Sequence, residues 1–234
     1  FLLKKKGTER KLSAAKLRFA WGVKGGLPFR PFPLRFRVLI FEEKECANMK
    51  EFMDKDFLLG TDTAKHLFHD YAEHMPLVDY HCHIPPQEIY EDRRFDNMVQ
   101  LWLGGRTPDG TYFGDHYKWR LMRSNGIPED YVSGGKPDFE RFVKFAEALE
   151  MAIGNPMYHW CNLELRQFFG YDKPLTPETA RECWDFCNEK LRHNPDLTVR
   201  GIIKKANVAM IGTTDDPIYT LEWHEKIAAD PSID

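Results

Sequence analysis

The sequence predicts an α/β fold in which parallel strands are covered by helices. Leu77–Cys82 is a short apolar run with the composition of a buried strand, and Pro85 and Pro86 end it. Asn207–Thr213 is a second β-capable run, and about residues 87–193 between the two are rich in helix signals. The order of strand, helical excursion and strand favours parallel pairing with helices on the outside.

Along the sequence, helices are expected before, between and after these strands. The first begins at Thr61 or Thr63, either of which can cap it, and Pro76 ends it near Met75. Pro217 suits the first turn of a last helix that reaches Ala229. The clearest helices between the strands are expected at residues 115–124, 139–153, 156–168 and 177–191.

Composition excludes several classes of protein. Of 234 residues, 42% are hydrophobic and 14% aromatic, which excludes disordered and fibrous chains. The longest apolar runs are far shorter than the roughly 20 residues that cross a bilayer, so no membrane partner is expected. The five cysteines are an odd number in no zinc-ribbon spacing, which indicates reduced thiols and a cytoplasmic location, as in a bacterial cytosol.

Residues 1–48 differ in charge from the remainder. They hold 12 Lys and Arg against 4 Asp and Glu, a balance of +8, so the remainder carries −11. Glycines and prolines interrupt any sustained amphipathic helix there, and no secretory apolar region follows the basic start. We interpret residues 1–48 as a non-native leader, read through from upstream of Met49 and disordered. Peptides from residues 1–48 in protein expressed from the native gene would contradict this interpretation.

The strongest chemical signal is His81-Cys82-His83 at the end of the first predicted strand. Alternate residues of a strand point to the same side, so His81 and His83 project together and Cys82 faces the other side. Two imidazoles on one face can bind one divalent cation, and α/β folds place their chemistry at the carboxyl ends of strands. The alternative is a pair of histidines that binds no metal.

A second group lies in the helix predicted at residues 115–124. His116 and Arg120 are four residues apart and share a helix face, with Tyr117 adjacent to it. A histidine beside a tyrosine offers two proton-transfer groups. On spacing alone, the alternative is an aromatic, cationic surface helix.

Other clusters give weaker signals. Asp215 follows the second strand, where its carboxylate can face a ligand or can cap the helix predicted at Pro217. Cys183 and Cys187 are expected to be packing residues of a helix. Three histidines of the first helix are interpreted as part of a solvated polar face: His66, His69 and His74.

Several segments resemble, in order, the uronate (glucuronate) isomerase family of the amidohydrolase superfamily. The resemblance covers residues 49–234. The segments are Phe52–Leu59, Leu77–His83, Trp102–Gly105, Asp115–Gly126, Gly154–Trp160 and Thr213–Pro217.

The resemblance implies the N-terminal portion of a distorted TIM (β/α)8 barrel, with a large helical insertion after the first strand. Such a barrel needs about 250 residues. Two recognisable strands cannot close it, so we expect a truncated chain that is inactive alone and prone to aggregate, with the apolar faces of both strands partly exposed.

The family interconverts D-glucuronate with D-fructuronate and D-galacturonate with D-tagaturonate. By resemblance, His81 and His83 bind a single divalent metal, commonly zinc, together with an aspartate after the last strand, beyond Asp234. His116 and Tyr117 line the site, and we expect them to assist ring opening or proton transfer through a cis-enediol. Arg120 and Asp215 are expected to contact the substrate.

The family usually runs from its W-L-G-G motif almost directly into D-H-Y-K-W-R. This chain inserts residues 106–114, whose Pro108-Asp109-Gly110 turn signal predicts a small loop or hairpin.

Two other functions remain open on the sequence. One is a metal-dependent hydrolase of the same superfamily. The other is a helical nucleic-acid-binding or protein-binding module with residues 1–48 as its basic arm, which the acidic body disfavours. For the isomerase we expect a uronate as the partner, no nucleic acid and, at full length, a homo-oligomer.

Overall fold

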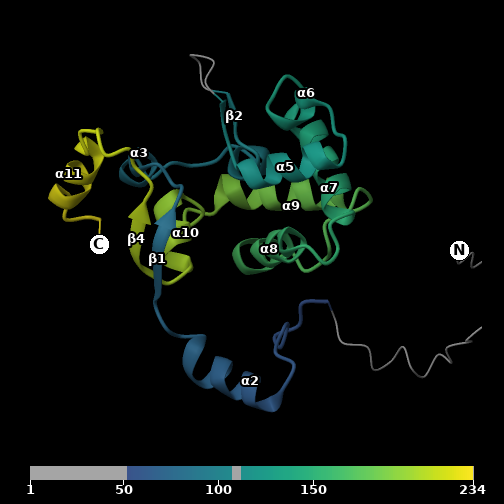
Figure 1. The fold of residues 1–234 in the computed structure, drawn as a ribbon, viewed down its shortest axis with the longest axis horizontal. Coiled ribbons are helices and arrows are strands. Elements are labelled where there is room, and N and C mark those ends of the chain that lie inside the picture. Colours follow the sequence, from purple (N-terminus) through teal and green to yellow (C-terminus); the bar gives the residue numbers. More distant parts are fainter. Residues whose placement is uncertain (1–51, 107–111, 234) are drawn as a thin grey trace, which may run out of the picture. The chain divides into compact units, whose positions relative to one another are not determined.

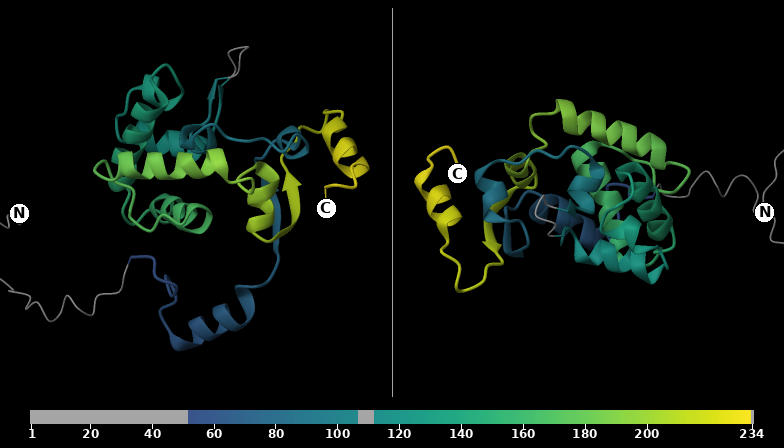
Figure 2. Two further views of the ribbon diagram at one scale, coloured as in Figure 1. Left: turned by 180° about the vertical axis from the view of Figure 1, so that it is seen from behind. Right: turned by 90° about the horizontal axis from the view of Figure 1, so that it is seen from above.

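A computed structural model describes residues 52–106 and 112–233. Within them, the α/β order is confirmed, because β1 (Leu77–Cys82) and β4 (Val208–Thr213) form a parallel pair (Figure 1). The two strands also lie side by side when seen from behind (Figure 2). The predicted leader, residues 1–48, lies outside the described residues.

The two strands approach closely near their carboxyl ends and are joined again just beyond them. A Cβ atom on Gly212 would lie 2.6 Å from the carbonyl oxygen of Tyr80, so only glycine allows this approach. Beyond the ladder, both the backbone N–H and the hydroxyl of Thr214 donate to the carbonyl oxygen of Cys82, at 3.1 and 2.9 Å. These bonds fix the carboxyl ends of β1 and β4 next to each other.

The partial exposure expected for these strands is confirmed. Leu77 and Val78 are 54% and 58% exposed, and Met210 of β4 is 54% exposed. In β1 only Cys82 is buried. Each strand therefore has apolar surface that no other described residue covers.

The first predicted helix is shorter and less regular than its pattern suggests. Thr61 caps α2 (Asp62–Leu67) by accepting a hydrogen bond from the N–H of Ala64. The chain continues as a π-helical segment, η1 (Phe68–Ala72). Neither element has a buried residue, so the apolar side of this helix is exposed as well. Of its histidines, His66 and His74 are exposed, whereas His69 is half-buried and bonds to Asp56 and Glu73.

The long segment between the strands is largely helical, as predicted. Its four main helices are close to the predicted ranges, although α9 begins three residues later than expected. These helices are α5 (His116–Ser124), α7 (Asp138–Glu150), α8 (Pro156–Glu164), which continues as η2 (Leu165–Phe169), and α9 (Ala180–His193). Four shorter helices accompany them: α3 (Pro86–Tyr90), α4 (Met98–Trp102), α6 (Glu129–Val132) and α10 (Val199–Lys205).

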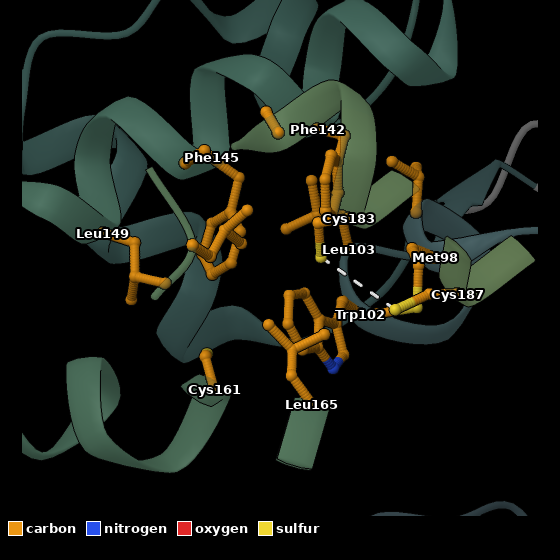
Figure 3. Packing of buried hydrophobic residues seen from close by; sticks show 14 of the residues in the cluster. Met98, Trp102, Leu103, Phe142, Phe145, Leu149, Cys161, Leu165, Cys183 and Cys187 are labelled. Atoms are coloured by element: carbon orange, nitrogen blue, oxygen red, sulfur yellow. Dashed lines mark hydrogen bonds between the residues drawn. The ribbon is translucent and has the colours of Figure 1, made fainter. Parts of the chain in front are cut away.

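The core lies among α4, α5, α7, α8 and α9 rather than against the sheet (Figure 3). Phe142, Phe145 and Leu149 recur at helical spacing on α7, and all three are fully buried. Burying each such side chain contributes about 1.5–3 kcal/mol. Cys183 and Cys187 are buried free thiols with their sulfur atoms 3.9 Å apart, which confirms that they are packing residues.

The predicted hairpin is confirmed in its strands, β2 (Gly105–Arg106) and β3 (Tyr112–Phe113), which pair antiparallel. Its connection, residues 107–111, lies outside the described residues. Gly104 precedes the hairpin at φ 64°, where a Cβ atom would lie 2.2 Å from the carbonyl oxygen of Phe113. The hairpin thus returns the chain to the start of α5.

The last helix was predicted too early. It is α11 (Glu222–Ala229), preceded by Leu221 in the left-handed conformation, and Pro217 lies in a turn instead. The N–H of Ile218 donates to the carboxylate of Asp216, which stabilises this turn. Among the described helices, none is long and apolar enough to span a membrane.

Candidate active site

The two histidines of the H-x-H motif lie together at the carboxyl end of β1. The ring centroids of His81 and His83 are 5.0 Å apart, with the rings nearly perpendicular. Both residues are exposed, whereas Cys82 between them is buried, as the alternation of a strand predicts. The carboxylate of Asp79 accepts a hydrogen bond from the backbone N–H of His81 at 3.3 Å.

The first turn of α5 extends this pair. The ring of His116, the first residue of the helix, lies 5.8 Å from that of His83. Asp115 caps the helix, because its Oδ1 accepts from the N–H groups of Tyr117 and Lys118 at 2.8 and 3.2 Å. The cap determines where α5 begins and therefore where the His116 ring lies.

Two further predicted site residues, Tyr117 and Arg120, follow His116 along α5. The ring centroids of His116 and Tyr117 are 4.3 Å apart. The guanidinium carbon of Arg120 lies 5.9 Å from the Tyr117 ring centroid. Five of the six predicted residues thus form one continuous series of contacts, from the end of β1 to the second turn of α5, although a helical segment and a hairpin separate them in sequence.

Asp215, the sixth predicted site residue, lies two residues after the end of β4. The hydroxyl of Thr213 donates to its Oδ2 at 2.6 Å and also lies 2.8 Å from Nε2 of His224, on α11. The same Nε2 lies 3.4 Å from Oδ2 of Asp215. Capping of a helix at Pro217, the alternative considered for Asp215, is wrong because no helix begins there.

His224 and Lys118 were not singled out from the sequence. No spacing links His224 to Asp215, because a turn and a helix start separate them. Lys118 did have a signal, since it lies four residues before Met122 on the buried face of α5, where a charge is unusual. Its side chain is 9% exposed, and its Nζ lies 2.8 Å from Oδ2 of Asp115.

Electrostatics favour an ionised Asp115 at the cap. Burial opposes the charge, but the ammonium group of Lys118 and the hydrogen bonds from Lys118 and Tyr117 outweigh it and lower the pKa of Asp115. The carboxylate therefore carries its charge at neutral pH, beside the positive end of the helix dipole.

The imidazoles of His81 and His83 suit a divalent cation, because both are exposed and neutral ring nitrogens are common ligands of zinc. Within residues 52–106 and 112–233, no group of three or more His, Cys, Asp or Glu side chains is arranged to hold a metal ion.

Comparison with known sequences gives one consistent family. A glucuronate isomerase family profile matches residues 49–234. A uronate isomerase of Lachnospira eligens is 56% identical over 186 residues, which are 80% of this chain and 38% of that protein. One from Lachnoclostridium phytofermentans gives the same identity and coverage.

Solved structures of similar fold belong to the same group of proteins. A uronate isomerase from Thermotoga maritima aligns with TM-score 0.68 at 32% identity, over 79% of this chain and 38% of that one. A glucuronate isomerase from Caulobacter crescentus aligns with TM-score 0.65 at 23% identity, which supports the fold alone. The chain thus spans 38% of the length of each of these relatives.

Proposed function

Because the chain belongs to the glucuronate isomerase family, we propose that residues 49–234 form the first part of an enzyme that interconverts aldose and ketose forms of uronates. The reactions are D-glucuronate to D-fructuronate and D-galacturonate to D-tagaturonate. The observation that carries the proposal is the proximity of His81, His83 and His116 at the carboxyl end of β1.

The parallel pair of β1 and β4 is, in this proposal, the beginning of a TIM barrel, and residues 86–205 are a helical insertion after its first strand. Both strands have exposed apolar surface, which the remaining strands and helices of a full-length protein would cover. The carboxyl ends of the strands carry the chemistry.

His81 and His83 would hold one divalent cation, of which zinc is the expected one. When bound, this cation polarises oxygen atoms of the substrate as a Lewis acid. The exposure of both imidazoles and their shared side of β1 support this assignment.

His116 and Tyr117 are placed to transfer protons. In the forward reaction the C2 proton of the open-chain aldose leaves, a cis-enediol forms, and C1 gains a proton while the O2 proton moves to O1. The imidazole of His116 is exposed and next to His83, so it can exchange a proton with a substrate bound there. Tyr117, in ring contact with His116, can relay a proton during ring opening.

Arg120 and Asp215 are proposed to contact the substrate. The cationic side chain of Arg120 extends the series beyond Tyr117 and suits the carboxylate of a uronate. Asp215, held by Thr213 beside the end of β1, suits a sugar hydroxyl.

The test uses a full-length chimera, in which residues 49–234 of this chain replace the matching 186 residues of the Lachnospira eligens protein. The chimera should convert D-glucuronate to a ketouronate and leave esters and amides intact. Hydrolysis of esters or amides without isomerisation would favour the hydrolase of the same superfamily instead.

A further inference from the structure

A buried lysine lies beneath the first turn of α5. Lys118 is 7% exposed and shares its helix face with Met122, which is fully buried. Its Nζ donates to Oδ2 of Asp115 at 2.8 Å, while Oδ1 of the same carboxylate caps the helix. One carboxylate therefore joins the buried ammonium group to the backbone that carries His116 and Tyr117.

A second acid completes the environment of this lysine. Glu164, the last residue of α8, accepts a hydrogen bond from the indole of Trp102, and Nζ of Lys118 lies 5.9 Å from the Trp102 ring centroid. Burial raises the pKa of Glu164 against the opposing effects of Lys118 and Trp102. Burial alone would lower the pKa of Lys118, but Glu164, Cys161 and Asp115 raise it. The lysine is therefore charged.

A charge is costly at this place. Phe145, Leu149 and Cys161 of the same core are fully buried and apolar, and a methionine or leucine at position 118 would pack there without losing hydration. Stability alone thus does not explain the lysine. The position of Lys118 explains its presence, because Lys118 binds Oδ2 of the capping residue Asp115. Asp115 directly precedes His116, whose ring approaches the end of β1.

We propose that Lys118, bonded to Asp115, is a positioning residue that fixes the start of α5 and thereby the His116 ring beside His83 and the Tyr117 ring against His116. The inference rests on the proposed function for its catalytic consequence but not for its structural one. Lys118 acts through Asp115 and contacts no substrate.

The test compares two lysine variants of the full-length chimera. Lys118→Met removes the charge at similar volume. Lys144→Met is the matched control, because Lys144 also pairs with a carboxylate three residues away, Glu147 at 2.8 Å, but on the surface. Lys118→Met should lower kcat roughly 10- to 100-fold, as a misplaced catalytic group does, with KM within about twofold and metal content unchanged. Lys144→Met should change none of these. An unchanged kcat in Lys118→Met would overturn the proposal.

A double variant separates positioning from stability. Lys118→Met removes the positive charge that favours ionisation of Glu164 and should lower Tm, whereas Lys118→Met with Glu164→Gln should recover most of that Tm. The double variant should still have the low kcat, because Asp115 remains without its lysine. Recovery of kcat together with Tm would show that Lys118 only balances a charge, which overturns the proposal.

A structural measurement keeps the test independent of the reaction. Crystal structures of the chimera and of Lys118→Met should show the His83–His116 ring separation, 5.8 Å here, changed by the substitution. If the unsubstituted chimera does not isomerise uronates, the proposed function fails, and this separation still decides the role of Lys118. An unchanged separation would overturn that role.

Discussion

The ring of His83 at the end of β1 lies 5.8 Å from that of His116 at the start of α5. Between them in sequence lie α3, α4 and the β2–β3 hairpin. This contact joins the candidate metal ligands to the candidate proton-transfer residues.

Replacing either histidine of β1 should remove metal. In the full-length chimera, His81→Ala or His83→Ala should lose most bound zinc and activity, because each imidazole supplies a direct ligand. His193→Ala is the control, since His193 is an exposed histidine that pairs with Glu189 on α9. Metal content measured by mass spectrometry decides the matter, and unchanged zinc in His81→Ala would refute the ligand assignment.

His116→Asn should separate chemistry from metal binding. We expect turnover to fall about 10²- to 10⁴-fold, as for the loss of a general acid or base, while zinc content stays near one per chain. Steady-state kinetics and metal analysis on the same preparation measure both quantities. A parallel loss of metal and rate would instead make His116 a ligand.

The cap of α5 should make stability depend on pH. The folded pKa of Asp115 is lowered, so its ionised form contributes stability that is fully present above the ordinary pKa of about 3.9 and is lost as pH falls through the folded pKa. Asp115→Asn keeps a capping side chain but removes the charge that pairs with buried Lys118, so it should destabilise the chimera by roughly 1–3 kcal/mol at pH 7, and less below about pH 4. Urea unfolding across pH 3–7 tests this dependence. A difference that is constant with pH would contradict it.

The 234-residue chain alone should be inactive and prone to aggregate. Leu77, Val78 and Met210 expose apolar strand surface, which favours association with other chains. Val78→Lys with Met210→Glu should reduce aggregation without lowering Tm, because both side chains are already more than half exposed and the two new charges, on partner residues of the strand pair, are opposite. Light scattering and thermal unfolding measure the two effects. A soluble monomer that turns over glucuronate would contradict the prediction.

Local patterns predicted the parts of the site that are close in sequence. The strand alternation of residues 77–83 placed His81 and His83 together, and a helix was predicted at residues 115–124, where α5 lies. The parallel pairing of β1 with β4 followed from chain order. The first two features depend on neighbouring residues and the strand pairing depends on the order of the elements, and a single sequence displays both.

Features that depend on distant contacts were not predicted. The charge of Glu164 acts on Lys118 only because α5 and α8 share a core, and His224 reaches Asp215 only through the turn that replaces the start of a helix at Pro217. The turn forms because Asp216 accepts a hydrogen bond from its own loop, a competitor to helix formation that the proline signal does not reveal.

Anomalous scattering at the zinc edge from crystals of the full-length chimera tests the site most directly. The predicted result is one zinc peak about 2.0–2.1 Å from a ring nitrogen of both His81 and His83, with His116 nearby but outside ligand distance. Zinc bound elsewhere, or a peak that His116 ligates in place of either histidine, would contradict the assignment of the two histidines as the metal ligands.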